Sequence, residues 1–475
     1  MATHSTDLAV LGAGPGGYAA AFLAADLGMQ VALIDTEPDP GGVCVYRGCI
    51  PSKALLHVAK LLDETKHAAA FGVEFGEPRI DLARLRTWKD QVVGKLTTGT
   101  GQLGRLRKIR YIQGRATILD PTTFEVEAAG GRERVTFRHA ILATGSRPAT
   151  VPGLDVDSPR LMDSTSALDL PDIPRTLLVV GGGYIGLELG TVYAALGTKV
   201  TVVEMTAGLL PGADRDLVAV LAKRVDTIVD AVLLNTKVVA MKAEQDLIRV
   251  TFEDADLQRR EQGFDRVLVS VGRKPNSDIP GLQRTKVQLD SRGFIRVDAS
   301  RRTAEPTLYA IGDVAGEPML AHKASHEGRA AVEAIHGEDV VFAPNAIPAV
   351  VFTDPEIAWC GLTEEQARRE GRPIDVAKFP WGASGRATTL GRNDGLTKLV
   401  VERGTERLLG VGIVGTGAGE LIAESVLAIE MGAVVSDLKL SIHPHPTLSE
   451  TVMEAAEVYF GQSTHAYRPK KKASG

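Results

Sequence analysis

Two cysteines near the N-terminus, Cys44 and Cys49, are separated by four residues and stand directly before an expected helix that includes residues 54–60. The N-terminus of a helix and nearby cations stabilise thiolates, and Arg47 and Lys53 supply two such cations. Thiolates exchange readily with disulfides, so the pair is interpreted as redox-active. A structural zinc site would need four ligands, and no second Cys/His pair accompanies this one. A metal site and two unrelated buried thiols remain the alternatives.

The third cysteine and a C-terminal histidine give weaker indications of a chemical role when each is considered alone. Cys360 follows Trp359 in an apolar stretch, and we expect it to be a small buried side chain. His445 precedes Glu450 by five positions. An imidazole can take a thiol proton at neutral pH, and a carboxylate can hold its other ring nitrogen. On spacing alone, an ordinary loop histidine is the alternative.

A glycine turn at residues 12–17 lies between an apolar run at 7–11 and an expected helix that ends near residue 27. Another apolar run at 31–35 completes a strand–turn–helix–strand unit. In such a unit the first glycine permits the tight turn, the second admits a pyrophosphate to the helix N-terminus, and the third allows close packing. These are Gly12, Gly14 and Gly17. Asp35 follows Gly12 by 23 positions, where an acid accepts from ribose hydroxyls, so the unit predicts a bound dinucleotide.

The same pattern recurs at residues 177–204, with the turn glycines Gly181, Gly183 and Gly186. Glu204 follows Gly181 by 23 positions, the interval found in the first unit. Two turns with equal internal spacing predict two Rossmann-type domains and two dinucleotides. Glu204 places a negative charge where a 2′-phosphate would lie, so the second site is expected to prefer NAD over NADP.

Composition limits the class of protein. The chain has 475 residues, 44% hydrophobic and 24% charged, which is typical of a globular protein of about three domains. A net charge of −5 offers no basic field for nucleic acid. We expect no signal peptide and no membrane span, because no apolar run approaches about 18 residues. Three cysteines suit a reducing compartment, the cytoplasm. A basic tail at 468–472 is expected to be a solvated terminus.

Further motifs extend the pattern along the chain, at residues 143–148, 271–276, 310–314, 319–323, 379–381 and 443–450. In this order, with the two turns and the cysteine run, they resemble the pyridine nucleotide-disulfide oxidoreductase family, class I, nearly end to end. The resemblance implies an α/β fold with two Rossmann-type dinucleotide-binding domains plus an α+β C-terminal dimerisation domain. The expected segments are an FAD-binding domain with the redox disulfide (1–152), an NAD-binding domain (153–275), a central segment completing the FAD site (276–346) and an interface domain (347–475).

The resemblance also implies an activity: oxidation of protein-bound dihydrolipoamide by NAD, through a Cys44–Cys49 disulfide and tightly, non-covalently bound FAD. Substrate sulfur would attack Cys44, and Cys49 would become the thiolate against the flavin. His445 would take the substrate proton and Glu450 would orient its ring. The expected partners are a second copy of the chain, whose flavin and disulfide the His–Glu pair would face, and a lipoyl-bearing acyltransferase or lipoyl carrier protein. These carriers belong to 2-oxoacid dehydrogenase complexes or the glycine cleavage system.

Binding residues follow from the same resemblance, and no metal is expected. The FAD side would comprise Gly12, Gly14, Gly17, Asp35, Lys53, Gly145 and Asp313. The NAD side would comprise Gly181, Gly183, Gly186, Glu188, Glu204 and Gly272. Lys53 would lie beside the reactive end of the flavin with Glu188 as its ion-pair partner, where the pair would steady charge on the reduced flavin.

One departure and two alternatives accompany the resemblance. Most of the family carries asparagine and valine where this chain has Tyr46 and Arg47. A permanent cation between the cysteines is expected to stabilise thiolates and raise the reduction potential of the disulfide. The nearest alternative function is an NAD(P)H-dependent disulfide or mercuric reductase of the same family; Glu204 argues against NADPH, and the lack of a C-terminal cysteine pair argues against the mercuric type. The other alternative is a non-catalytic, flavin-binding structural subunit.

Overall fold

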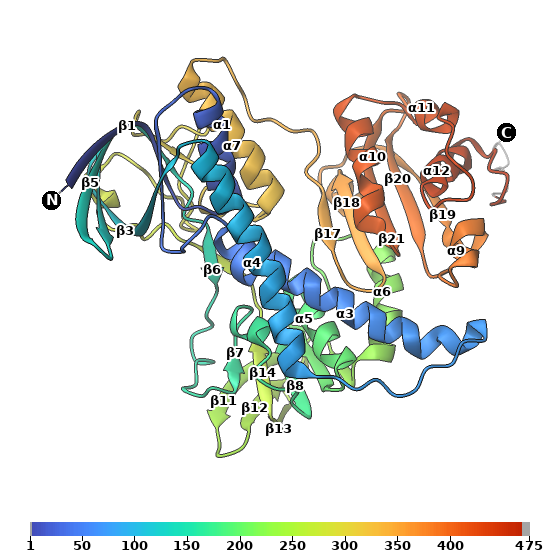
Figure 1. The fold of residues 1–475 in the computed structure, drawn as a ribbon. Helices are drawn as coiled ribbons and strands as arrows, with labels where there is room; N and C mark the ends of the chain where they lie inside the picture. Colours follow the sequence, from blue (N-terminus) through green and yellow to red (C-terminus); the bar gives the residue numbers. More distant parts are fainter. Residues whose placement is uncertain (1, 468–475) are drawn as a thin grey trace.

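The computed structural model describes residues 2–467, and the basic tail at 468–472 lies outside the described residues. The chain forms three parts, each built on its own sheet (Figure 1). The blue first part is joined by a yellow segment from beyond residue 275, the green second part lies below it, and the orange and red third part stands apart from the first. The predicted pair of Rossmann-type units followed by an α+β domain is confirmed.

The first part is a sheet whose parallel strands are buried on both faces. Its strands are β1 (Ala2–Leu11), β2 (Val31–Asp35), β3 (Arg110–Asp120), β4 (Thr123–Ala128), β5 (Gly131–Leu142) and β16 (Leu308–Ala310). β1 pairs in parallel with β2 and β5, β5 also pairs with β16, and β4 pairs antiparallel with β3 and β5. Leu8 and Val10 of β1 are fully buried, as an apolar run between covered faces predicts.

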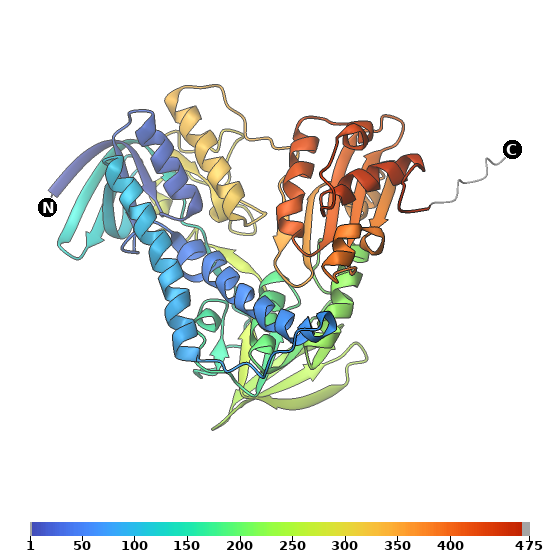
Figure 2. The ribbon, with the colours of Figure 1, turned by 45° about the vertical axis from the view of Figure 1, so that its right-hand side comes forward.

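Two helices cover one face of this sheet and meet through small residues. α1 (Pro15–Asp26) and α7 (Ala321–His336) lie side by side in both views (Figures 1 and 2). A Cβ on Gly328 would lie 2.6 Å from the carbonyl oxygen of Gly16, so the helices meet backbone to backbone. The segment after residue 275 therefore returns to the first sheet, through β16 and α7.

The second part repeats the parallel arrangement. The sheet runs β10 (Ala231–Leu233), β9 (Lys199–Val203), β8 (Thr176–Val180), β14 (Arg266–Val269) and β7 (Leu161–Met162), with α5 (Tyr184–Ala195) and α6 (Arg215–Ile228) between its strands. An antiparallel sheet of β11 (Lys237–Ala243), β12 (Ile248–Glu253) and β13 (Arg259–Phe264) packs beside it. A two-stranded ladder, β6 (Ser146–Pro148) with β15 (Arg273–Pro275), joins the first two parts.

The third part is an antiparallel sheet with helices. Its strand order is β17 (Ala349–Val351), β18 (Glu356–Gly361), β21 (Leu408–Gly415), β20 (Leu396–Glu402) and β19 (Ile374–Pro380). The helices are α8 (Glu364–Arg369), α9 (Gly385–Thr389), α10 (Ala418–Glu430), α11 (Val435–Leu440) and α12 (Glu450–Phe460). Cys360 lies in β18 at 1% exposure, and burial raises the pKa of its thiol to about 12, as expected for a packing residue.

Three helices from the cysteine region connect these parts. α2 (Gly42–Arg47) and α3 (Cys49–His67) follow β2, and α4 (Leu82–Leu106) returns to β3. α3 contacts both α4 and α5 and runs beneath the third part (Figure 1). The helix that carries Cys49 therefore contacts the second Rossmann unit as well as the first. None of the helices among residues 2–467 is long and apolar enough to cross a membrane.

Candidate functional site

The first glycine turn has the geometry that its spacing predicts. Gly12 has a φ of +101°, and a Cβ there would lie 2.3 Å from the carbonyl oxygen of Ala143. A Cβ on Gly17 would lie 1.8 Å from the carbonyl oxygen of Gly12, so helix and strand pack too closely for any side chain. Gly14 precedes α1, and no side chain caps the helix. Its N-terminal amides are left to an anionic ligand.

The acid at the end of β2 supports this turn. Asp35 accepts the backbone N–H of Ala13 at 2.5 Å and that of Glu37 at 3.0 Å, one at each carboxylate oxygen. The carboxylate is thereby fixed at the edge of the turn, where a ribose would lie.

The second turn repeats this geometry. Gly181 has a φ of +108°, and a Cβ on Gly186 would lie 2.3 Å from its carbonyl oxygen. Glu204 follows β9 and accepts the N–H of Gly182 and that of Thr206, both at 2.8 Å. Gly183 has open space around its missing side chain, as the position nearest a pyrophosphate requires. The two predicted units therefore match in side-chain contacts as well as in spacing.

One cleft of about 350 Å³ is lined by all of the predicted FAD-side residues. It is lined by the first turn and Asp35, both cysteines, the Lys53–Glu188 pair, Gly145 and Asp313. Asp313 accepts from the Ser146 hydroxyl at 2.5 Å, and Gly145 has a φ of +68°. Gly272, with a φ of +121°, lies between β14 and β15 and is not among the lining residues. Residues far apart in sequence thus form a single site.

The two cysteines of this cleft are free thiols with opposite pKa shifts. A hydrogen bond with Cys44 lowers the pKa of Cys49 to about 7; burial opposes this, and the Lys53 ammonium lowers it further. The same hydrogen bond, with burial, raises the pKa of Cys44. The two shifts favour Cys49 over Cys44 as the thiolate of the reduced pair.

Arg47, the cation between the cysteines, has a carboxylate partner. Its guanidinium pairs with the carboxylate of Glu37, which lies on the loop after β2. Lys53 is the cation that lowers the pKa of both thiols. The effect of Arg47 on the thiolates stays a prediction, and the structure adds that its guanidinium is paired with a carboxylate on the loop after Asp35.

Lys53 is held by two contacts from other parts of the chain. Its Nζ donates to Oε2 of Glu188 at 2.7 Å and lies 4.5 Å from the centre of the Phe352 ring. The N–H of Phe352 donates to Oε1 of Glu188 at 3.0 Å. The Glu188 side chain is 4% exposed, so its charge is compensated within the protein. This arrangement fixes one cation beside Cys49.

His445 and Glu450 form the predicted pair, away from this cleft. Nδ1 of His445 lies 2.9 Å from Oε1 of Glu450, and Oε2 accepts the N–H of Thr447 at 2.7 Å. Burial raises the pKa of Glu450, but the Thr447 N–H and the His445 ring outweigh it and lower the pKa overall. The His445 side chain is 72% exposed, and neither residue lines the cysteine cleft. The ring is oriented through Nδ1, and the pair lies outside the cleft that holds this chain's own thiols.

Comparisons with known proteins identify the family. Residues 6–328 match the pyridine nucleotide-disulphide oxidoreductase family, and residues 347–456 match its dimerisation domain. The chain belongs to this family. A dihydrolipoyl dehydrogenase from Vibrio cholerae is 47% identical to it, covering 98% of this chain and 97% of the relative. One from Geobacillus stearothermophilus is 44% identical, covering 97% of each.

Solved structures agree with this membership. LpdA from Mycobacterium tuberculosis has a TM-score of 0.87 at 27% identity, covering 96% of this chain and 99% of the other. RclA from Escherichia coli, an HOCl-induced flavoprotein disulfide reductase, has a TM-score of 0.86 at 26% identity with the same coverage. The pyridine nucleotide-disulphide oxidoreductase described here is thus an enzyme of the flavin- and NAD-linked type, and its third part is a dimerisation domain.

The residues of the cleft fit FAD. The uncapped amides before α1 suit a pyrophosphate, and the doubly fixed carboxylate of Asp35 suits a ribose. The second turn offers the same features to NAD, and the buried charge of Glu204 would oppose a 2′-phosphate. In this oxidoreductase, FAD would be held by residues of the same cleft that contains the thiols and the Lys53–Glu188 pair.

Sequence reasoning missed three residues of this oxidoreductase site. Phe352, which holds both Lys53 and Glu188, carries no local signal because it lies in another domain. Arg273 donates to the Ser146 hydroxyl and carbonyl oxygens, both at 2.7 Å, and so fixes the group that holds Asp313. Tyr184 lines the cleft from inside the second glycine fingerprint, where burial raises the pKa of its hydroxyl to about 12.

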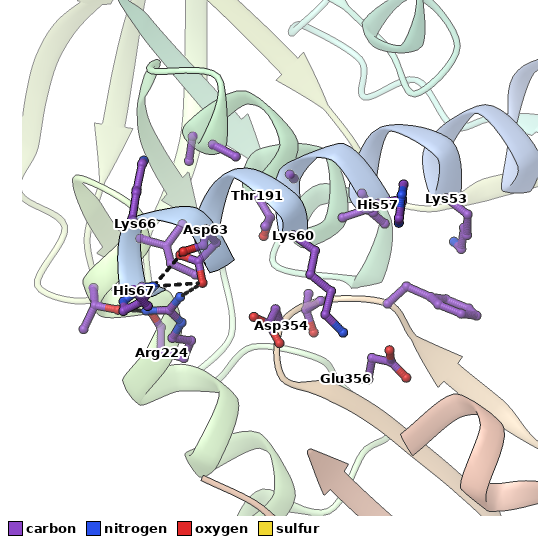
Figure 3. Close-up of a pocket in the computed structure, with 18 residues that line it drawn as sticks. Lys53, His57, Lys60, Asp63, Lys66, His67, Thr191, Arg224, Asp354 and Glu356 are labelled. Atoms are coloured by element: carbon purple, nitrogen blue, oxygen red, sulfur yellow. Dashed lines mark hydrogen bonds and ion pairs between the residues drawn. The ribbon is translucent and has the colours of Figure 1, made fainter. Parts of the chain in front are cut away.

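A second cavity, of about 640 Å³, follows the other side of α3 (Figure 3). It begins at Lys53 and continues past Lys60, which points toward Asp354 and Glu356 of the dimerisation domain. At its far end Asp63 accepts from Arg224 at 2.5 Å. The oxidoreductase therefore has polar space on both sides of the helix that carries Cys49.

Within residues 2–467, one group of acids has the spacing of metal ligands: Asp214, Asp216 and Glu364. Lys398 lies among them at 1% exposure, and its Nζ is 2.6 Å from Asp214, 2.8 Å from Asp216 and 3.2 Å from Glu364. The ammonium supplies the charge that a metal would bring. This cluster joins the second Rossmann unit to the dimerisation domain.

Proposed function

We propose that the chain is a dihydrolipoyl dehydrogenase that oxidises dihydrolipoyl groups carried on another protein, with NAD as the final acceptor. The observation that carries this proposal is the asymmetric thiol pair, Cys44 and Cys49, in the same cleft as the first nucleotide turn and the Lys53–Glu188 pair. The identity of 41–47% to curated dihydrolipoyl dehydrogenases along nearly the whole chain supports it. FAD, when bound, supplies the two-electron relay between the thiols and NAD.

The residues divide the chemistry as follows. In the oxidised enzyme Cys44 and Cys49 are joined, and His445 takes the proton of a substrate thiol at Nε2. The substrate sulfur attacks Cys44, the Cys44–Cys49 bond breaks, and Cys49 leaves as the thiolate that Lys53 stabilises. His445 releases the first proton to solvent and takes the proton of the second substrate thiol, whose sulfur then attacks the substrate sulfur bound to Cys44. The bond to Cys44 breaks as the lipoyl disulfide closes, and Cys44 receives this second proton from His445.

The same proposal includes a homodimer. His445 and Glu450 line no part of their own cleft, and they lie in the dimerisation domain. A second copy would place its His–Glu pair against the thiols of the first, so that each site takes residues from both chains. The functional segments are proposed as 1–152, 153–275, 276–346 and 347–475. A reducing compartment such as the cytoplasm suits a thiol pair that cycles.

An anaerobic titration of the purified, FAD-loaded protein with dihydrolipoamide tests the proposal. Flavin absorbance should report reduction by the substrate, and added NAD should reoxidise it. Cys44→Ser should abolish this reduction while leaving reduction by NADH intact. Unchanged turnover in Cys44→Ser would contradict the disulfide mechanism.

Coenzyme choice is tested separately by steady-state rates with NADH and NADPH. The expected result is a strong preference for NADH, because Glu204 would repel a 2′-phosphate. A preference for NADPH would instead favour a disulfide reductase of the same family.

A further inference from the structure

Two neighbouring residues between the cysteines, Tyr46 and Arg47, contact one loop. Arg47, the last residue of α2, pairs with the carboxylate of Glu37. The hydroxyl of Tyr46 donates to the carbonyl oxygen of Asp39 at 3.0 Å and lies 3.2 Å from the N–H of Asp39, which donates to it. The loop of residues 36–41, between β2 and α2, is therefore fastened to α2 at two points. We call it the adenosine loop, because it begins directly after Asp35.

The adenosine loop is fixed on its other sides as well. The N–H of Glu37 donates to Asp35 at 3.0 Å, and the carbonyl oxygen of Glu37 accepts from the Tyr111 hydroxyl at 2.8 Å. The N–H of Gly41 donates to the carbonyl oxygen of Ala13, in the first glycine turn, at 2.8 Å. Because the N–H of Glu37 donates to Asp35, a displacement of Glu37 would also move the Asp35 carboxylate, which is the proposed ribose-binding group.

The other end of α2 packs against the glycine turn itself. Gly42 has a φ of +56°, and a Cβ there would lie 2.5 Å from the Cα of Gly14. The helix therefore crosses the turn with its N-terminus at the pyrophosphate position and its C-terminus tied to the adenosine loop. Arg47 lines the cleft, as do Asp35 and Gly14.

We propose that Arg47 and Glu37 form a latch that holds the disulfide-bearing helix α2 over the adenosine half of the FAD site and slows release of the cofactor. Arg47 is then a positioning residue that acts through Glu37, with Tyr46 as a second fastening. The latch rests on the proposed role of the first turn as the FAD site. It gives a role to a cation between the cysteines whose guanidinium is directed to the adenosine loop.

The test measures the rate of FAD release from the oxidised holoenzyme, by the rise in free-flavin fluorescence after dilution into mild denaturant. Arg47→Val and Glu37→Ala should each speed release about fivefold, which is typical of a partly exposed ion pair. The double variant should be no faster than either, since both remove one interaction. Arg47→Lys should recover part of the effect. Arg105→Gln is the matched control, because Arg105 contacts the same loop at Asp39 but is 67% exposed, and its release rate should be that of the parent.

Site-resolved alkylation of Cys49 across pH gives the second readout, and the latch predicts the same apparent thiol pKa in every variant. The proposal is overturned if Arg47→Val raises the thiol pKa and leaves FAD release unchanged, since Arg47 would then act on the thiolates. It is also overturned if Glu37→Ala leaves release unchanged while Arg47→Val speeds it, since Arg47 would then hold the cofactor directly. An equal effect of Arg105→Gln would assign the result to net charge. A purified chain that binds no FAD would instead contradict the proposed function.

Discussion

Lys53 and Glu188 act on the Cys49 thiol with opposite signs, so removing each should move its pKa in opposite directions. The Lys53 ammonium lowers the pKa of Cys49, and the Glu188 carboxylate raises it. Lys53→Met should therefore raise the thiol pKa, and Glu188→Gln should lower it. If the substitutions only damaged packing, the pKa of Cys49 would not be expected to rise in one variant and fall in the other.

The size of the effect follows from the order of the causes. The pKa of Cys49 falls from 9.0 to about 7, the hydrogen bond with Cys44 is the largest cause, and burial opposes the fall. Lys53 contributes less than that hydrogen bond, and the expected rise in Lys53→Met is about one pKa unit, which is typical of removing a nearby opposite charge. The fall in Glu188→Gln should be smaller, since Glu188 is the last of the main causes. The double variant should return toward the parent value.

The assay is alkylation of the reduced enzyme by iodoacetamide between acid and alkaline pH, with mass spectrometry of the peptide that contains Cys49. The thiolate is the reactive form, so the midpoint of the rate profile gives the pKa. Lys60→Met is the control: it removes a cation two helical turns further along α3, on the side of the second cavity, and should leave the midpoint unchanged. Midpoints that rise in both Lys53→Met and Glu188→Gln would refute the electrostatic reasoning.

Three further outcomes follow from the geometry. Gly183→Ala should leave thermal stability unchanged, because no atom lies within 4 Å of the added Cβ. It should raise the KM for NAD about tenfold, because the added methyl group would meet the pyrophosphate. An unchanged KM would mean that NAD binds elsewhere. Glu450→Gln should lower kcat for dihydrolipoamide about 10²-fold while sparing NADH oxidation by ferricyanide, because it weakens only the orientation of His445; an equal loss in both assays would argue for misfolding. Lys398→Met should destabilise the protein by about 3 kcal/mol in thermal unfolding, because it leaves the buried carboxylate of Asp214 without its cation. Added divalent cations should restore little, and unaltered unfolding would contradict this prediction.

The two nucleotide turns were predictable because their determinants are local. A glycine at a positive φ, a third glycine against the first and an acid at the end of the next strand all lie within one strand–turn–helix–strand unit. The structure adds that Asp35 and Glu204 bind equivalent amides, Ala13 N–H and Gly182 N–H. Spacing alone places such an acid at the sheet edge that carries the glycine turn, because close packing of the helix on the strands leaves little variation in their lengths.

The parts that could not be predicted depend on contacts between domains or on the direction of a long side chain. Phe352 donates to Glu188 although the two residues are 164 positions apart in sequence, and no local sequence pattern predicts this contact. Arg47 is close to both thiols in sequence, but its flexible side chain extends to Glu37, which the turn after β2 brings near. Proximity in sequence predicts that Arg47 acts on the thiols, whereas in the structure its guanidinium pairs with the carboxylate of Glu37.

The exposed histidine of the dimerisation domain connects the surface of this domain to the chemistry of the cleft. Glu450 holds the His445 ring through Nδ1, which leaves Nε2 directed outward from a side chain that is 72% exposed. Ile442, three residues earlier, is 99% exposed, and Leu427, Met431 and Leu440 of the same domain are each more than 60% exposed. Exposed apolar side chains in this domain favour burial against another protein surface. A second copy that covers these side chains would bring its own cleft next to His445. The oriented base would then lie against the thiol pair of the second copy, because it does not line the cleft of its own chain.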